Sequence, residues 1–157
     1  MVTAAWLKKT ELFGALEEFQ LDVLLSHSSV DSFPGGTTIF RQGDEATHLF
    51  VLIEGEIDLA VKTEEKIAFM TSRIDKEGSA FGIPSLIEPF RYNVTATSLK
   101  ASKVLTLDAR SLRDHLEKDP RMGMEIMKKL ASIYFERLNK MRSGVSNLLK
   151  MFKAKTP

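Results

Sequence analysis

The sequence predicts a mainly β fold with flanking helices: a double-stranded β-helix (jelly roll) with N-terminal helices and a long C-terminal helix. Between residues 30 and 109, short apolar runs alternate with turns rich in glycine, proline and acidic residues, and no long helical period interrupts them. This texture is typical of sandwiches and barrels, whereas a parallel sheet would need a helix after nearly every strand. The chain has 157 residues, which is enough for one domain with a sizeable core.

The N-terminal segment, residues 1–29, is expected to form short helices. Apolar residues recur at helical spacing between residues 10 and 26, and Thr10 is a suitable N-cap. The jelly roll, residues 30–109, is predicted to contain six or more short strands, and the β-rich runs are Val30–Phe33, Thr37–Arg41, His48–Ile53, Ile57–Lys62, Lys66–Ile74, Tyr92–Leu99 and Lys103–Asp108.

The C-terminal segment, residues 110–157, is expected to contain a short helix and a long one. The short helix covers Ser111–Lys118 and ends where Pro120 restricts the residue before it. Pro120 also suits the first turn of the next helix. That helix is predicted to reach about residue 152, although Gly144 weakens it. The three segments are expected to fold as one domain.

Composition excludes several classes of protein. The formal net charge of +1 argues against a globally basic nucleic-acid binder. The absence of cysteine excludes disulfides, thiolate metal sites and cysteine nucleophiles. The first residues lack the pattern of a signal peptide, and no apolar run approaches the roughly 18 residues that span a bilayer. We therefore expect a cytoplasmic protein without a membrane span.

Residues 81–96 carry the features of an anion pocket. Gly82 lets the backbone approach a ligand closely. A proline then begins a helical turn in which Ser85 and Leu86 offer N–H groups, and the Ser85 hydroxyl adds a further donor. Arg91 follows and would supply a charged donor. An anionic small molecule is the ligand that this combination favours.

Two stretches carry a resemblance to a known family. The first begins at Ile39 and has a glycine–acid turn at Gly43, a small residue at Ala46, four apolar residues and a closing glycine. The second is Phe81–Ala96. Together with the order of elements, they resemble the cyclic-nucleotide-binding domain of catabolite-activator-type regulators, protein kinase A regulatory subunits and gated ion channels, over about residues 10–142. The resemblance implies a β-roll, a regulatory rather than an enzymatic role, and a phosphate-binding cassette over residues 81–96.

The cassette departs from the family pattern at two positions. Members that bind cyclic nucleotides place a glutamate for the ribose 2′-hydroxyl directly after the glycine, where this chain has Ile83, which accepts no hydrogen bond. They place an arginine against the phosphate at the position of Tyr92, and Arg91 lies one residue earlier. Because strand side chains alternate between faces, this shift would point Arg91 away from the pocket. A loop shorter by one residue would bring it back, so both orientations stay open.

The resemblance also implies which residues contact the ligand, since the long helix of the family closes over the base. A solvated helix flank is the alternative for the two residues of this helix. The expected ligand contacts are Phe81, Gly82, Ile83, Pro84, Ser85, Leu86, Arg91, Tyr92, Asn93, Thr95, Arg137 and Asn139.

Apolar residues of the long helix follow spacings of four and three without interruption, which is a heptad seam. A helix that packs on its own barrel explains the first turns. A two-fold homodimer explains the whole stripe, and the related regulators dimerise in this way. The predicted interface residues are Met127, Ala131, Tyr134, Leu138, Met141, Val145 and Leu148, with Phe152 next in the pattern.

The tail after Glu136 carries six basic residues and no acid. A favourable interaction with the helix macrodipole explains them, and binding to nucleic acid or to an anionic membrane surface is the alternative. Only about fifteen residues follow Met141, too few for the helix-turn-helix of the related transcription regulators. We therefore expect no direct DNA binding.

The predicted function is a regulatory sensor that binds a small anionic ligand, such as a cyclic nucleotide, and signals through rearrangement of its dimer to a separate effector protein. No other cofactor and no enzymatic activity are expected. His27, His48 and His115 lack the spacing of a metal site. The alternative is that one of these histidines is an axial ligand of a haem. The rival function is a ligand-free dimerisation scaffold with a degenerate pocket.

Overall fold

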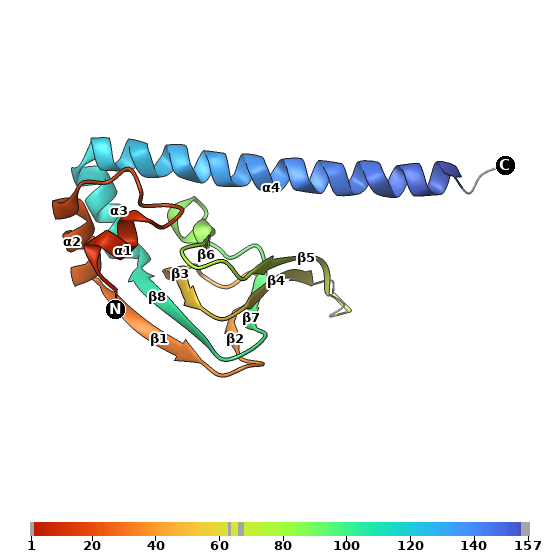
Figure 1. Ribbon diagram of the computed structural model, residues 1–157, viewed down its shortest axis with the longest axis horizontal. Coiled ribbons are helices and arrows are strands. Elements are labelled where there is room, and N and C mark those ends of the chain that lie inside the picture. The colour runs from red at the N-terminus through yellow and green to blue at the C-terminus, as the bar shows by residue number, and fades with distance from the viewer. Residues whose placement is uncertain (1, 63, 66–67, 155–157) are drawn as a thin grey trace.

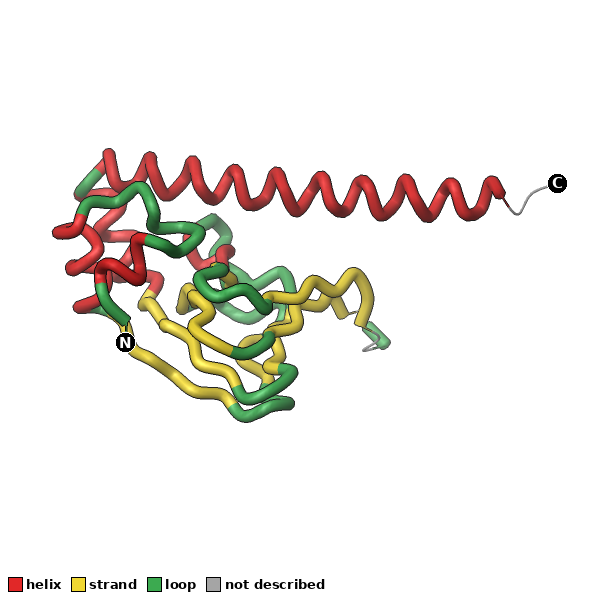
Figure 2. Tube along the Cα trace, in the orientation of Figure 1, coloured by secondary structure: helices red, strands yellow, loops and turns green. Residues whose placement is uncertain are grey.

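The computed structural model describes residues 2–62, 64–65 and 68–154, and it contains a β-roll with helices at one end and one long helix along its side (Figure 1). Figure 2 shows the same arrangement by element type, with the long helix extending well beyond the strands. The elements are α1 (Ala4–Lys8), α2 (Glu18–Ser26), β1 (Ser28–Phe33), β2 (Thr38–Phe40), β3 (His48–Glu54), β4 (Ile57–Lys62), β5 (Ala68–Ile74), β6 (Ala80–Phe81), the 3₁₀ turn η1 (Ile83–Leu86), β7 (Thr95–Ser98), β8 (Ser102–Asp108), α3 (Ala109–Lys118) and α4 (Pro120–Ala154).

The strands form two antiparallel sheets of four strands each within the described residues. The first sheet has the order β1-β8-β3-β6, and the second has the order β2-β7-β4-β5. This architecture confirms the predicted mainly β roll with flanking helices. The strand Ile57–Lys62 has the predicted bounds, and residues 66 and 67 of the strand predicted over Lys66–Ile74 lie outside the described residues.

The strand predicted to begin at Tyr92 begins instead at Thr95. Tyr92 pairs with the loop after β2 rather than with a strand of the second sheet. Its N–H donates to the carbonyl of Asp44 at 3.0 Å, and its carbonyl accepts from the N–H of Gly43 at 2.7 Å. This local pairing fixes the orientation of residues 90–92 before the chain enters β7.

The prediction that Thr10 caps a helix N-terminus was wrong. Thr3 caps α1 by accepting from the N–H of Trp6, and Glu17 precedes α2 in a capping box. The Thr10 hydroxyl instead donates to the carbonyl of Leu7 at the C-terminal end of α1, and Thr10 is buried. Residues 9–16 form turns, not a helix, and their apolar side chains Leu12, Phe13 and Leu16 are buried.

The helices after the roll begin where their caps place them. Asp108 caps α3 by accepting from the N–H of Ser111, so this helix starts at Ala109, two residues before the predicted start. The long helix α4 starts at Pro120, as predicted, and extends to Ala154. Among the helices of the described residues, none combines the length and the hydropathy that crossing a membrane requires.

Two hydrophobic clusters form the core. The first lies between the first sheet, the N-terminal helices, α3 and the beginning of α4. The second lies inside the roll, between the two sheets. The long helix contributes one stripe to the first cluster, and its buried members are Met122, Ile126, Leu130 and Ile133.

Candidate functional site

The cassette turn begins at Gly82, whose backbone is left-handed with φ of 75°. A side chain here would bring a Cβ to 3.0 Å from both the carbonyl oxygen of His48 and the ring of Phe50, so glycine is required by conformation and by space. The chain then forms η1, in which Ile83, Ser85 and Leu86 are buried and Pro84 is half-buried.

The donors expected from this turn are partly engaged within it. The Ser85 N–H donates to the carbonyl of Gly82 at 3.1 Å, so it is not open to a ligand in this structure. The Ser85 hydroxyl oxygen is buried and has no hydrogen-bond partner. Ile83 packs in the first cluster, with the N-terminal helices and α4. The turn therefore contains one buried hydroxyl without a partner, that of Ser85. Residue 83 is an isoleucine and offers no hydrogen-bond acceptor from its side chain.

Arg91 and Tyr92 take opposite directions. Arg91 is exposed, and its Nη1 donates to the carbonyl of Gly43 at 3.0 Å. Tyr92 is only 4% exposed and belongs to the cluster inside the roll. The position at which the family resemblance places the phosphate arginine is therefore occupied by a neutral aromatic side chain, and the arginine faces the loop after β2.

Tyr92 is held inside the roll by stacking and by two hydrogen bonds. Its ring lies 3.7 Å from that of Phe40, with 14° between the planes. Its hydroxyl donates to the carbonyl of His48 at 2.7 Å and accepts from the His48 N–H at 3.1 Å. Such buried hydroxyls are stable because both the donor and the acceptor functions are satisfied.

Three phenylalanine rings continue this stack through the roll. The rings of Phe50 and Phe81 are 5.1 Å apart, and those of Phe40 and Phe50 are 5.8 Å apart. Together with Tyr92 they form what we call the aromatic cluster. It connects β2, β3 and β6 with the segment before β7, so the roll interior beneath the cassette is packed with aromatic side chains (Phe40, Phe50, Phe81 and Tyr92).

Burial raises the pKa of the Tyr92 phenol above its ordinary value of 10.0, mainly because the phenolate would lose its hydration. Burial also raises the pKa of Tyr134. In both cases the folded state holds its proton more tightly than the unfolded chain does. The contribution to stability is therefore complete below about pH 10 and is lost as the pH rises through the raised pKa.

We expect the urea concentration at the denaturation midpoint to fall as the pH rises above about 10. In Tyr92→Phe, which lacks the titrating hydroxyl, only the Tyr134 contribution remains, so the slope of stability against pH should become shallower above pH 10. Equal slopes in the two proteins would show that Tyr92 ionises as freely in the folded state as in the unfolded chain.

Two arginines from the C-terminal helices bind backbone carbonyls, one within the cassette and one at the residue before it. Arg137 of α4 donates from Nη2 to the carbonyl of Ala80 at 3.2 Å. Arg113 of α3 donates from Nη1 to the carbonyl of Ser85 at 2.6 Å, and its guanidinium lies 4.0 Å from the centre of the Phe90 ring. Sequence reasoning missed Arg113, because nothing in the spacing of α3 indicates which of its residues meets the cassette.

The other residues expected to contact a ligand are dispersed. Asn93 and Asn139 are exposed. Thr95 is buried and lines a separate cavity, described below. The structure thus gathers Phe81 and Tyr92 inside the roll, and it leaves the two asparagines and Arg91 on the surface.

The stripe of α4 predicted to form a dimer interface differs from the stripe that packs on the roll. Met127, Leu138, Met141, Val145 and Leu148 are between 41% and 53% exposed, and Tyr134 is half-buried. At 3.6 residues per turn, the two stripes are separated by about 100° around the helix axis. Tyr134 packs against the first cluster, whereas the other members of this second face, Ala131 included, are exposed.

The three histidines lie on different elements: His27 follows α2, His48 begins β3 and His115 lies in α3. Among the described residues, no group of three or more histidine, aspartate, glutamate or cysteine side chains is placed to hold a metal ion. The ring of His27, at the C-terminal end of α2, lies 5.1 Å from the ring of His115 in α3. His48 has its Nδ1 at 2.8 Å from the Thr47 hydroxyl.

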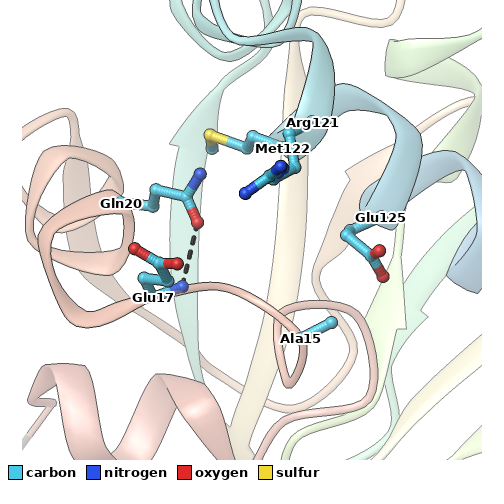
Figure 3. A pocket seen from close by; sticks show the side chains of 6 residues that line it. All are labelled: Ala15, Glu17, Gln20, Arg121, Met122 and Glu125. Atoms are coloured by element: carbon cyan, nitrogen blue, oxygen red, sulfur yellow. Dashed lines mark hydrogen bonds between the residues drawn. The ribbon is translucent and has the colours of Figure 1, made fainter.

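A cavity of about 260 Å³ lies between the turn before α2, α2 itself and the first turn of α4 (Figure 3). Two carboxylates and one guanidinium line it, so its charges are mixed. Gln20 is committed within the protein, since its Oε1 accepts from the Glu17 N–H and its Nε2 donates to Asp119. The lining residues are Ala15, Glu17, Gln20, Arg121, Met122 and Glu125.

Comparisons with known proteins agree on one family. The sequence model of the cyclic nucleotide-binding domain matches residues 30–119, more than half of the chain. A CRP-like cAMP-activated global transcriptional regulator of Mycobacterium tuberculosis is 20% identical over 143 residues, which cover 91% of this chain and 62% of that protein. The cAMP-activated global transcriptional regulator CRP of Salmonella typhimurium is 25% identical over 129 residues, which cover 82% of this chain and 59% of that protein. The chain thus spans about three fifths of the length of these curated relatives.

Solved structures give the same result. A cyclic nucleotide-binding protein from Geobacter metallireducens superposes with a TM-score of 0.77 at 28% identity, covering 88% of this chain and 99% of that one. The sensor domain of the transcriptional regulator DNR from Pseudomonas aeruginosa superposes with a TM-score of 0.72 at 22% identity, covering 86% of this chain and 90% of that one, and it supports the fold alone.

Proposed function

We propose that this chain, which belongs to the cyclic nucleotide-binding domain family, is a dimeric regulatory module whose roll interior is closed by its own aromatic side chains. Its dimer presents the same surface to an effector protein whether or not a cyclic nucleotide is bound. This is the ligand-free alternative that the sequence left open beside the sensor.

The observation that carries this proposal is the position of Tyr92. A cyclic nucleotide in the roll needs a cation against its phosphate and an acceptor for its ribose hydroxyl. Tyr92 supplies no charge, its hydroxyl is engaged with His48, and its ring fills space against Phe40. Ile83 offers no acceptor and is buried in a different cluster. The loss of each of these two charge-assisted contacts lowers the affinity for a cyclic nucleotide by roughly one to two powers of ten.

The contacts between the cassette and the C-terminal helices also support the proposal. In a ligand-gated module, the bound molecule ties the cassette to the long helix. In this chain Arg137 of α4 donates to Ala80, the residue before the cassette, and Arg113 of α3 donates to Ser85 within the cassette. Both are charged donors bound to backbone carbonyls, which are among the stronger hydrogen bonds in proteins. Side chains of the chain itself therefore hold α3 and α4 against the cassette and the residue before it.

The occupant that we propose for the exposed stripe of α4 is a second copy of this chain. The stripe keeps the spacings of four and three from Met127 to Leu148, a length of about 32 Å at 1.5 Å per residue. Such a regular seam matches another helix of the same period. A two-fold axis beside α4 would bury the seam of each copy against the other.

A sensor for a small anion is the second candidate, and one observation favours it. The buried Ser85 hydroxyl has no partner, and buried polar atoms without partners are uncommon in native structures. An anion at the cassette turn would satisfy it. The inward Tyr92 and the outward Arg91 argue against a cyclic nucleotide as that anion.

A thermal-shift titration of the full chain with cyclic AMP and cyclic GMP at millimolar concentration tests the proposal. We expect no change in melting temperature, because the neutral Tyr92 stands at the position of the phosphate arginine and its ring packs on Phe40 inside the roll. A ligand present at a hundredfold excess over its Kd would stabilise the fold by about 2.7 kcal/mol and raise the melting temperature by several degrees. Such a shift, if it is abolished in Ser85→Ala, would contradict the ligand-free scaffold and support the sensor.

A further inference from the structure

We propose that a cavity on the outer face of the second sheet binds a phosphate-bearing small molecule. This cavity of about 400 Å³ lies at the end of the sheet where β2 and β4 finish, and Thr95 at the start of β7 is the one cassette residue that lines it. Its volume falls within the range of small-molecule sites. Its lining residues are Thr38, Arg41, Gln42, Lys62 and Thr95.

The sheet register places the cavity on the outside of the roll. Ala96 pairs with Leu59, and both belong to the cluster inside the roll. Thr95 pairs with Ala60 and is the neighbour of Ala96, so its side chain takes the opposite face. Ligand chemistry at this cavity is thus independent of whether the roll interior accepts a nucleotide.

Every side chain that lines the cavity can donate a hydrogen bond, and no carboxylate lines it. Arg41 and Lys62 carry two positive charges. In the part of the chain that the structure describes, neither forms an ion pair, whereas Arg73 and Lys103 on the same roll pair with glutamates. Two adjacent cations without a compensating acid favour an anion between them.

Two of the neutral side chains, those of Gln42 and Thr95, are held in place by hydrogen bonds that their oxygen atoms accept. The Gln42 N–H donates to Thr95 Oγ1 at 3.0 Å, and the Lys62 N–H donates to Gln42 Oε1 at 2.9 Å. The amide NH₂ of Gln42 and the hydroxyl hydrogen of Thr95 are not used in these two bonds, so both can donate to a ligand. Thr95 is 4% exposed, so this hydroxyl is a buried donor at a basic cavity and not a surface group with ready access to water.

A phosphate group fits this donor set in both charge and geometry. Its dianion matches the two cations, and its several oxygens can accept from guanidinium, ammonium, amide and hydroxyl donors together. The planar fork of an arginine suits phosphate oxygens, and a lysine acts beside it as a point charge. The formal charge of the whole chain is only +1, so the basic character is local, which favours a small molecule over an extended nucleic-acid backbone.

Titration of the isotope-labelled full chain with inorganic pyrophosphate, followed by the NMR signals of its backbone amides, tests this inference. In about 0.1 M sodium chloride, we expect saturable shifts at the amides of Gln42, Lys62 and Thr95. The double variant Arg41→Gln, Lys62→Gln should raise the Kd at least about tenfold. Both side chains are exposed, and Lys62 contributes to the fold through its backbone N–H, so the variant keeps the structural hydrogen bonds.

The matched control is Arg110→Gln, Lys118→Gln, which removes the same two charges from exposed positions on α3. It should leave the Kd within about twofold of the unmodified chain. Equal weakening in the two double variants, or no saturable shift at millimolar pyrophosphate, would overturn the inference. Shifts confined to the amides of residues 82–86 would also overturn it and would place the anion at the cassette.

Discussion

A chain that carries Val145→Glu and Leu148→Glu is expected to sediment as a monomer at micromolar concentration, where the unmodified chain sediments as a dimer. The two residues lie in the exposed stripe of α4, at 51% and 53% exposure, and they contact nothing in the roll core. Burial of such a side chain contributes about 1.5–3 kcal/mol, and a two-fold interface contains each substitution twice. The dissociation constant should therefore rise by at least about three powers of ten.

The control for this experiment is Ser143→Glu, Asn147→Glu. It adds the same two charges within the same turns of α4, at exposed positions on the side of the helix opposite the seam. Analytical ultracentrifugation should show this variant as a dimer. Monomeric behaviour of the unmodified chain, or dissociation by both double variants, would contradict a dimer through this stripe.

Tyr92→Ala is expected to lower the free energy of unfolding by about 3–5 kcal/mol, the cost of replacing a large buried aromatic side chain by alanine. The substitution removes the ring that stacks on Phe40 and leaves the backbone N–H and carbonyl of His48 without their partner. Since whole domains are stable by only about 5–15 kcal/mol, this is a large share of the total. Urea denaturation followed by circular dichroism measures it.

Two further substitutions separate packing from hydrogen bonding at this position. Tyr92→Phe keeps the ring and removes the hydroxyl, so it should cost about 1–3 kcal/mol for the two unpaired backbone groups. Asn93→Ala changes the exposed neighbour and should alter stability by less than about 0.5 kcal/mol. An unchanged stability of Tyr92→Ala would mean that Tyr92 does not close the roll, and the interior would then be open to a ligand.

The sequence by itself determined the class of fold and the place of the cassette. Glycines at the turns and the alternation of apolar residues specify short antiparallel strands, and Ile57–Lys62 was predicted with the bounds that the structure has. The turn at Gly82 could be recognised because few residues other than glycine adopt its backbone. The start of α4 followed from Pro120 for a similar local reason. These features depend on nearby residues, which is why a sequence displays them.

The tertiary structure alone decided which side chains face the roll interior. Arg91 and Tyr92 are neighbours, and a shift of one residue exchanges their faces. The hydrogen bonds between residues 90–92 and the loop at residues 43–46 set this register, and they join segments more than forty residues apart. The contacts of Arg113 with Ser85 and Phe90 depend on the docking of α3 in the same way.

The long helix shows both sources of information in one element. Its spacing revealed an apolar seam, but an apolar period does not state which surface covers it. Only the packing of Met122, Ile126, Leu130 and Ile133 on the roll showed that the seam from Met127 onward belongs to a different face. Local patterns fix what each segment becomes, whereas its orientation depends on contacts between distant segments that form only when the chain is folded.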